Sequence, residues 1–325
     1  MTAAASAETI RILLDTDMAM GVPGADVDDG FALALALAEP SVVVELVTTV
    51  NGNADVESGS FLSGELLERL GVPDIPVVQG AAAPLSFPDR RRGAPDAIRS
   101  RFGHHAPSPG YAAAELAARV AAEPGALTVV AIGPLTNIAA AVNLDPDFAS
   151  NVREIVIMGG VYLGHTHDRG MPGEFNFWVD PEAADAVLRS GARIRLVGLD
   201  VTLKARLTRE QAEDLRTRTG RFAPFAGEHT LRWIEYLAEE APGDPEAALS
   251  CAMHDPLAVG ALTRPDLLDW RDAHVEVVTG PGIARGVAVA DFLESRDAPA
   301  ANASVAVGVR GDEFVAHLVE RVSTL

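Results

Sequence analysis

Five aspartates are concentrated near the start of the chain, in a stretch with the residue types of a metal site. They are Asp15, Asp17, Asp26, Asp28 and Asp29. Like charges at this density repel one another unless a cation or a hydroxyl-rich ligand lies among them. Oxygen-only clusters of this kind suit a hard cation such as Ca²⁺. A solvated acidic loop is the alternative interpretation, but it explains poorly why the acids lie between two apolar segments.

Those two apolar segments predict how the acids are positioned. Ile10–Leu14 is typical of a strand, and Asp29–Ala38 is rich in good helix formers. A strand that enters the cluster and a helix that leaves it would place the carboxylates at the carboxyl edge of a parallel sheet. That edge is where α/β proteins bind their ligands.

The alternation of strands and helices continues along the chain and predicts an α/β fold. We expect a single domain over residues 1–325, with a mainly parallel, Rossmann-like central sheet flanked by helices and a mostly helical insertion at about 200–262. Further predicted strands are Val42–Val50, Ile75–Val78, Leu127–Ile132, Glu154–Met158, Arg193–Leu199 and Ser304–Val309, with a hairpin of His274–Thr279 and Arg285–Ala290. Further predicted helices are Ala54–Leu70, Tyr111–Ala122, Pro134–Val142, Pro181–Arg189, Thr208–Thr219, Phe222–Glu240, His254–Leu262 and Glu313–Val322. Gly80–Pro109, rich in Gly, Pro and Arg, is expected to be a long loop.

Composition narrows the class of protein. The 325 residues carry a net charge of −20 with a pI of about 4.7, which argues against binding to nucleic acid or to an anionic membrane. Cys251 is the only cysteine, so an internal disulfide is excluded and a reducing compartment is compatible. The first nine residues lack the basic start and apolar run of a signal peptide, and no apolar run reaches membrane-spanning length. We therefore expect a cytoplasmic enzyme with a small-molecule substrate.

Other polar clusters also follow predicted strands, so they are expected on the same rim as the acids. They are Asn51–Asn53, Gly133–Asn137, Met158–Gly160, Glu174–Asn176 and His254–Asp255. Taken alone, Asn51–Asn53 fits an ordinary turn, and Asp255 before Pro256 fits a helix cap. Zinc-spaced Cys and His pairs, a dinucleotide-binding glycine pattern, a Walker loop and a Gly-x-Ser-x-Gly elbow are all missing from the sequence.

Eight short strings, taken together, resemble the inosine–uridine nucleoside hydrolase family. In order they are DTD, VDDGFALALAL, VTTVNGN, IGPLTNIA, IVIMGG, GEFNFWVDPEAA, HDP and RGVAVAD, and they run from about Ile10 to Asp291. The resemblance implies a calcium-dependent N-glycosidase that cleaves a ribonucleoside to ribose and free base. Relatives in this family are commonly homodimers or homotetramers.

The resemblance also implies roles for individual residues. The calcium ligands would be Asp17, Asp29, Asp255 and the backbone carbonyl of Ile132, and Asp17 would activate the calcium-bound water as general base. The ribose hydroxyls would be held by Asp28, Asn53, Glu174 and Asn176, with Met158 lining the ribose pocket and Asp168 near the 5′-hydroxyl. His254 would lie beside the base as an acid for the leaving group, and Asp15 would support the other acids from behind.

Some segments depart from the family pattern. The loop 18–27 is longer than usual and adds Asp26, and Asp168 stands where an Asn is common. Segments 80–109 and 221–240, which would build the base pocket, are least like the family. The sequence therefore does not predict whether a purine or a pyrimidine base is preferred. Within these two segments, His104 and His105 fit exposed loop positions, and the spacing of Trp233 and Tyr236 favours core packing over stacking on a base.

Two other functions remain open at this level. One is a ribose- or nucleoside-binding protein that retains the metal site without catalysis. The other is an aspartate-nucleophile phosphohydrolase, since an Asp-x-Asp after the first strand also opens that fold. The second would need a lysine on the rim, and Lys204 is the only lysine in the chain.

Overall fold

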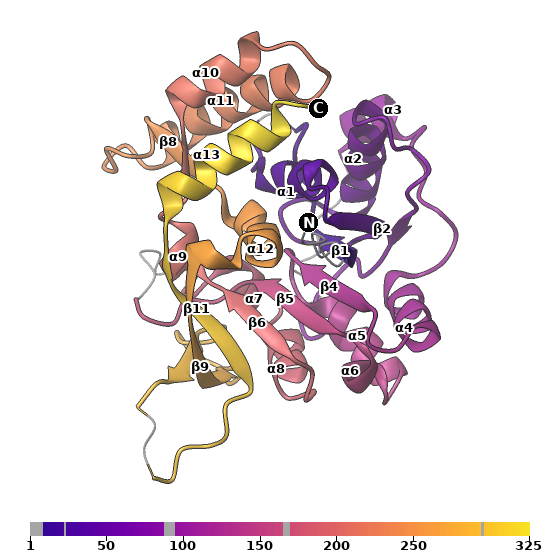
Figure 1. The fold of residues 1–325 in the computed structure, drawn as a ribbon, viewed down its shortest axis with the longest axis vertical. Helices are drawn as coiled ribbons and strands as arrows, with labels where there is room; N and C mark the ends of the chain where they lie inside the picture. The colour runs from indigo at the N-terminus through magenta and orange to yellow at the C-terminus, as the bar shows by residue number, and fades with distance from the viewer. Residues whose placement is uncertain (1–8, 23, 88–94, 165–169, 294–295) are drawn as a thin grey trace, which may run out of the picture.

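A sheet of nine strands forms the centre of the protein (Figure 1). The computed structural model describes residues 9–22, 24–87, 95–164, 170–293 and 296–325. The strands are β1 (Ile10–Thr16), β2 (Val42–Thr49), β3 (Val77–Gln79), β4 (Leu127–Ala131), β5 (Glu154–Met158), β6 (Ile194–Val197), β9 (Leu268–Val277), β10 (Ala288–Asp291) and β11 (Ala303–Val309). Their order is β10-β9-β11-β6-β5-β4-β1-β2-β3, and all neighbouring pairs from β11 to β3 are parallel. At the other end of this sheet, β9 pairs antiparallel with both β10 and β11. The predicted α/β class with a mainly parallel sheet is confirmed.

The order of the first six strands identifies the ligand-binding edge. From one edge it runs 3-2-1-4-5-6, the order of a doubly wound sheet. β1 lies between β2 and β4, so the chain leaves β1 towards one side and later returns to its other side. The crevice at the carboxyl ends of β1 and β4 is therefore the topological switch point, where open α/β sheets bind ligands.

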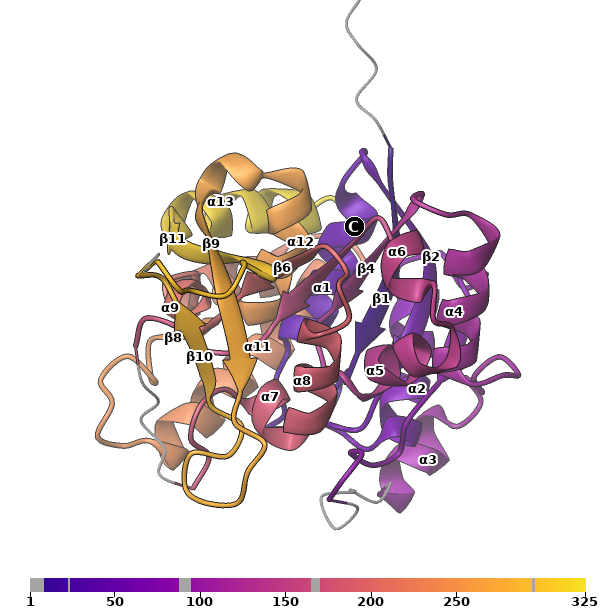
Figure 2. The same ribbon diagram turned by 90° about the horizontal axis from the view of Figure 1, so that it is seen from below.

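Two layers of helices cover the two faces of the sheet (Figure 2). One face packs against α1 (Asp28–Ala38), α2 (Val56–Arg69), α12 (His254–Thr263) and α13 (Gly311–Val322). The other face packs against α4 (Ala112–Ala122), α5 (Thr136–Leu144), α6 (Phe148–Asn151) and α8 (Pro181–Leu188). Strand side chains alternate between the two layers: Ile12 and Leu14 face the first and Leu13 the second.

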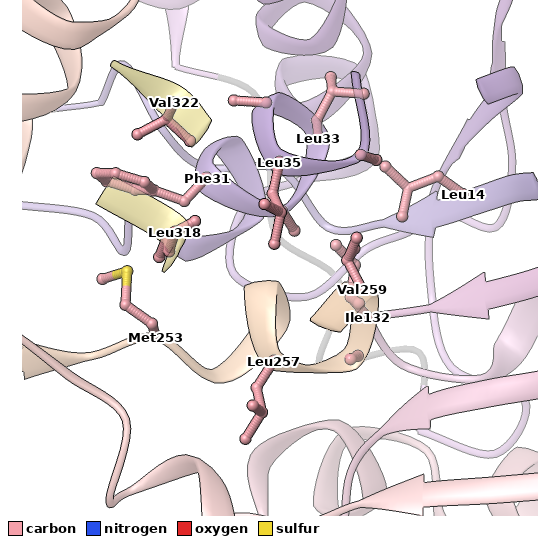
Figure 3. Packing of buried hydrophobic residues seen from close by; sticks show 14 of the residues in the cluster. Leu14, Phe31, Leu33, Leu35, Ile132, Met253, Leu257, Val259, Leu318 and Val322 are labelled. Atoms are coloured by element: carbon pink, nitrogen blue, oxygen red, sulfur yellow. The ribbon is translucent and has the colours of Figure 1, made fainter. Parts of the chain in front are cut away.

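The first layer is held together by apolar side chains from distant parts of the chain. Phe31 of α1 lies beside Leu318 of α13 (Figure 3), and Leu35 of α1 and Leu257 of α12 belong to the same buried cluster. All four side chains are fully buried. Complete burial of a large apolar side chain contributes about 1.5–3 kcal/mol each. This packing fixes the start of α1 and the start of α12, and both starts carry acids of the predicted site.

The predicted helical part, 200–262, contains helices and one small sheet. The helices are α9 (Leu199–Thr202), α10 (Arg209–Thr217), α11 (Ala223–Glu240) and α12. The sheet pairs β7 (Arg206–Thr208) with β8 (Ser250–Ala252) in antiparallel fashion. Both strands have only three residues, so an alternation of apolar and polar residues cannot be recognised in the sequence. Cys251 is fully buried in β8, consistent with its expected role as a small packed residue.

Three local expectations need correction. Segment 80–109 is not entirely loop, because it contains α3 (Asp96–Phe102), whose Ile98 and Phe102 are buried one helical turn apart. The hairpin is longer on its first strand, and β9 begins at Leu268. A short helix, α7 (Phe175–Val179), precedes α8. Among the described residues, no helix is both long and apolar enough to cross a membrane.

Candidate active site

A cavity of about 330 Å³ opens beside the carboxyl ends of β2, β4 and β5. It is lined by Asp26, Asp28, Asn53, Ile132, Met158, Met171, Glu174, Phe175, Asn176, Leu199, Trp233, His254 and Asp255. Acids and amides share this lining with aromatic and aliphatic side chains. The cavity therefore has the mixed lining that suits a polar ligand with an aromatic part.

Asp17 is buried at the tip of β1 and held by backbone. Its Oδ2 accepts a hydrogen bond of 2.6 Å from the backbone N–H of Asn53. Gly52 makes this contact possible, because a Cβ at that position would lie 1.9 Å from the same oxygen. A Cβ at Gly133, after β4, would lie 3.1 Å from Oδ1. Gly52, after β2, and Gly133, after β4, thus leave room for the Asp17 carboxylate that a side chain at either position would occupy.

Three further acids meet where α1 and α12 begin. One carboxylate oxygen from each of Asp28, Asp29 and Asp255 lies within 4.8 Å of the others, and all three residues are buried. The backbone N–H of Asp255 donates to Oδ2 of Asp28 at 3.1 Å, and the Thr16 hydroxyl donates to Oδ1 of Asp29. Asp255 was a candidate helix cap, and that interpretation is wrong. Helix α12 begins one residue earlier, at His254, and has no side-chain cap.

Burial and mutual repulsion raise the pKa of every acid in this group. Burial is the main cause for Asp17, Asp28 and Asp255, whose pKa values lie well above the ordinary aspartate value, and the neighbouring carboxylates add to it. Burial also raises the pKa of Asp29 to about 7. Without a cation, this concentration of negative charge is unfavourable in the folded protein.

The oxygens that lack partners test whether a metal ion fits here. Among the residues that the structure describes, Oδ1 of Asp17 and Oδ2 of Asp29 are buried without a hydrogen-bond partner. Such orphaned acceptors are costly in a folded protein unless something else satisfies them. All the donors are oxygens, which is the preference of Ca²⁺ and not of softer metals. The donor set therefore fits a hard divalent cation.

Asp15 does not line the cavity and is held behind it. Its Oδ1 accepts from the Thr48 hydroxyl at 2.5 Å and from the Asn137 side chain at 2.8 Å, and burial raises its pKa to about 7. Asn137 also donates to the carbonyl of Thr49 at 2.9 Å and accepts from the N–H of Ala81 at 2.8 Å. Sequence reasoning noted the string containing Asn137 but gave the residue no role. Its amide connects the ends of β1 and β2 to the segment after β3.

The opposite wall of the cavity is built around the start of α7. Glu174 caps this helix, and its carboxylate accepts from the N–H groups of Asn176 at 2.7 Å, Gly160 at 3.0 Å and Phe177 at 3.1 Å. Burial nevertheless raises the pKa of Glu174 to about 7. The Asn176 amide donates to the carbonyls of Ile132 at 3.0 Å and Met158 at 3.2 Å. Four residues predicted from the sequence thus form one hydrogen-bonded wall.

His254 lies on the cavity wall beside α9. Its Nδ1 is 2.7 Å from the hydroxyl of Thr202, a contact that the sequence did not indicate. Burial lowers the pKa of His254 to about 4, with a smaller effect from Arg206. The imidazole is therefore neutral at pH 7, and the Thr202 contact fixes the orientation of its ring.

Aromatic side chains complete the cavity. Trp233 of α11 lines it, and its ring stacks on Tyr236 with centroids 5.3 Å apart and planes 12° apart. Trp233 is half-buried and also packs against the core of the first layer, as expected, whereas Tyr236 is exposed. Stacking within the pair explains the spacing of the two residues. Phe175 and Met171 line the same cavity but were not singled out from the sequence.

The long loop 18–27 brings an additional acid to the site. Asp26 lines the cavity and hydrogen-bonds with the side chain of Asp28, as well as accepting from the N–H of Val27 at 2.7 Å. A Cβ at Gly24 would touch the ring of Tyr236 at 3.3 Å, so the loop lies directly against α11. Asp168, the predicted contact for the 5′-hydroxyl, falls outside the described residues. Asp180 caps α8, accepting from the N–H of Ala183 at 3.1 Å.

Comparison with known proteins gives a consistent result. The family model described as inosine-uridine preferring nucleoside hydrolase matches residues 12–316. A non-specific ribonucleoside hydrolase RihC of Salmonella newport is 37% identical over 317 residues, covering 94% of this chain and 95% of the relative. A pyrimidine-specific ribonucleoside hydrolase RihA of the same organism is 34% identical over 324 residues, covering 96% and 98%.

Solved structures agree with the sequence relatives. A plant nucleoside hydrolase, the PpNRh1 enzyme, superposes with a TM-score of 0.83 at 29% identity, covering 97% of this chain and 99% of that one. A purine-preferring ribonucleoside hydrolase from Gardnerella vaginalis superposes with a TM-score of 0.82 at 27% identity, covering 97% and 98%.

Proposed function

Because this chain belongs to the inosine-uridine preferring nucleoside hydrolase family and is a nucleoside hydrolase, we propose that it hydrolyses the N-glycosidic bond of a ribonucleoside to ribose and free base, with Ca²⁺ as cofactor and Asp17 as the base. The observation that carries the proposal is the buried Asp17 carboxylate, which has one oxygen fixed by Asn53 and the other without a partner. A phosphohydrolase is not supported: the family is different, and Lys204 is not among the residues that line the cavity.

The cation would be held by Asp17, Asp29, Asp255 and the carbonyl of Ile132. When bound, Ca²⁺ supplies positive charge that compensates the buried acids, lowers the pKa of a water molecule and orients the ribose diol. The clustering of Asp29 and Asp255 and the orphaned oxygens of Asp17 and Asp29 support this assignment. The carbonyl of Ile132 already accepts from Asn176 and has a second lone pair available.

Asp17 would act as the general base. Its fixed oxygen accepts from Asn53, which leaves Oδ1 to take the proton from the attacking water. The water then adds to the anomeric carbon as the bond to the base breaks. The transition state resembles an oxocarbenium ion, and a pocket rich in carboxylates stabilises its positive charge.

The ribose would be held by side chains that backbone contacts already orient. Asp28, Glu174 and Asn176 each make hydrogen bonds to backbone groups, and each lines the cavity. Their remaining acceptor and donor atoms would meet the sugar hydroxyls. The side chain of Asn53, which hydrogen-bonds with Asp29, lines the cavity beside them. Met158 packs beside them. Fixed partners of this kind lower the cost of orienting a substrate.

The base would leave from the part of the cavity that Trp233, Phe175 and His254 line. A neutral His254 has one N–H, which would donate to the departing base and not transfer a proton from an imidazolium ion. The relatives are named as pyrimidine-specific, non-specific and purine-preferring enzymes, so both classes of base belong in the assay.

The remaining sequence-based expectations stay predictions. We propose one nucleoside-hydrolase domain over residues 1–325, with its part at about 200–262 bordering the base pocket. Leu199, Trp233 and His254 support this arrangement, because they come from that part or its border and line the cavity. A homodimer or homotetramer located in the cytoplasm also remains a prediction.

The deciding experiment is release of reducing sugar from a panel of purine and pyrimidine ribonucleosides. We expect turnover by the purified chain, loss of turnover after exhaustive chelation, and recovery when Ca²⁺ is restored. Saturable nucleoside binding without any release of ribose would instead establish a non-catalytic binding protein. Turnover that is undiminished by chelation would contradict the role of the cation.

A further inference from the structure

A cluster of two histidines and two glutamates lies outside the cavity, at the contact between α2 and the turn that follows α3. Ligand atoms of Glu65, His104 and His105 lie within 4.8 Å of one another. A second glutamate, Glu68, has its Oε2 3.6 Å from Nδ1 of His105. None of the four residues lines the nucleoside cavity.

The local fold explains why these side chains meet. Glu65 and Glu68 are three residues apart on α2, so they share one face of that helix. Helix α3 packs against α2, and its last residue, Phe102, accepts from the N–H of His105 at 3.0 Å. This turn directs both histidines to the glutamate face of α2.

A glycine on α2 makes room for the inner histidine. A Cβ at Gly64 would lie 2.8 Å from the Cβ of His105, so any other residue would push the histidine away. The ring of His105 is only 9% exposed, and its Nε2 lies 3.0 Å from Oε2 of Glu65. The ring of His104, which is exposed, lies over it with centroids 4.0 Å apart. His105 was expected to be an exposed loop residue, but its ring is nearly buried.

We propose that Glu65, His104 and His105 form a second metal site, selective for Zn²⁺ or a similar transition metal, with Glu68 as an outer partner of His105. Two imidazoles and one carboxylate are a borderline donor set, which suits Zn²⁺ and does not suit Ca²⁺. Zn²⁺ bonds of about 2.0–2.1 Å place neighbouring ligand atoms roughly 3.3 Å apart in a tetrahedron. Nε2 of His105 and Oε2 of Glu65 are 3.0 Å apart, close to that value. Glu68 faces the other ring nitrogen, Nδ1, at 3.6 Å, where it would orient the imidazole from outside the metal.

Charge also favours a cation at this position. The two glutamates contribute two negative charges, and Arg69 offsets one of them by an ion pair of 2.8 Å with Oε1 of Glu65. The Oε2 atom of the same carboxylate faces His105. With three protein ligands, a water molecule would complete the tetrahedron, and the metal would link α2 to the turn after α3. The alternative is a simple hydrogen bond between Glu65 and His105, which requires neither His104 nor a metal.

The test uses the full chain without an affinity tag, freed of metal and then saturated with Ca²⁺ so that the aspartate site is occupied. Zn²⁺ is titrated by calorimetry, and Co²⁺ by its visible ligand-field absorption. We expect one equivalent to bind and the thermal midpoint to rise. His104→Ala and Glu65→Gln should each weaken binding at least tenfold and remove the thermal shift.

Glu57→Gln is the matched control for Glu65→Gln. Glu57 lies on the same helix and pairs with Arg99 of α3 at 2.6 Å, outside the cluster. This variant should bind Zn²⁺ like the unmodified chain. Absence of saturable binding, or equal affinity in all three variants, would overturn the site. Neither result would bear on nucleoside hydrolysis, because the cavity residues are unchanged.

Discussion

The backbone N–H of Asn53 donates to Oδ2 of Asp17 at 2.6 Å and thereby gives the two oxygens of one carboxylate different surroundings. Oδ2 is fixed by the segment after β2, whereas Oδ1 is buried without a partner among the described residues. A metal ligand that also acts as a base needs this kind of division.

Replacement of Asp17 should separate catalysis from folding. Asp17→Asn retains the shape of the side chain but removes its charge, so we expect kcat to fall by about 10²–10⁴ and Ca²⁺ to bind more weakly. Because burial and Asp29 raise the pKa of Asp17, the metal-free variant should unfold at a higher temperature than the metal-free parent. Ribose release, calcium calorimetry and thermal unfolding measure the three effects. A near-normal kcat would exclude Asp17 as the base.

The space that Gly52 leaves for the Asp17 carboxylate can be tested by a substitution that adds only a methyl group. Gly52→Ala would place a methyl group 1.9 Å from the present position of the Asp17 carboxylate oxygen, which must then move. We expect a loss of kcat of at least tenfold with little change in secondary structure. Gly243→Ala is the matched control, since a Cβ at Gly243 meets nothing within 4 Å. Equal activity of the two variants would show that the position of Asp17 is not critical.

The buried acids predict how the stability of the metal-free protein depends on pH. Burial raises the pKa of Asp15 and Glu174 to about 7, so the folded chain keeps protons that the unfolded chain releases near pH 4. Stability should therefore fall as pH rises from about 4 to 7. His254 and His229, whose pKa values burial lowers to about 4, act in the opposite direction, but only up to about pH 6.5.

Thermal unfolding between pH 6.5 and 7.5 isolates the contribution of the acids. In chelator, the unfolding temperature should drop across this interval, and excess Ca²⁺ should raise it more at pH 7.5 than at pH 6.5. A metal-free unfolding temperature that is constant or increases over the same interval would contradict the raised pKa values. Measurements in two buffers of different charge control for buffer binding.

The contact between Thr202 and His254 predicts an effect on the leaving base. Thr202→Val keeps the volume of the side chain but removes the hydroxyl that is 2.7 Å from Nδ1. The ring would lose its fixed orientation, and kcat for natural nucleosides should fall about threefold to tenfold with a smaller change in KM. A riboside whose leaving group needs no proton should be affected much less. Equal losses on both substrates would indicate a general structural effect.

Asp26 provides a prediction specific to the long loop of this chain. It lines the cavity and hydrogen-bonds with Asp28, so Asp26→Asn should disturb the side chain proposed to bind the ribose. We expect KM to rise several-fold with a smaller effect on kcat. Asp244→Asn, in the exposed turn after α11, serves as the control. An unchanged KM would show that Asp28 is positioned without its neighbour.

The alternation of strands and helices and the convergence of the strand ends were predictable, because apolar periodicity and polar strings after strands both indicate a parallel sheet. Asp28, Glu174, Asn176 and Asp255 do share one cavity as expected. The role of Asn137 was not predictable, since its amide joins segments 56 and 122 residues away in sequence. The same holds for Thr202, which meets His254 only through packing of α9 beside α12. Helix α3 had a sequence signal, the pair Ile98 and Phe102, which the surrounding Gly and Pro residues obscured.

Asn137 ties the ends of β1 and β2 to the segment after β3 through a single side chain. Because the strands themselves are locked in register, the rim behaves as part of the rigid sheet and not as a set of independent loops. Because the rim is rigid, the acids are held close together in the folded protein despite their mutual repulsion. A nucleoside that binds at this rim would find its contacts already in place. Selectivity for the base would then depend mainly on loop 18–27 and α11, which border the cavity.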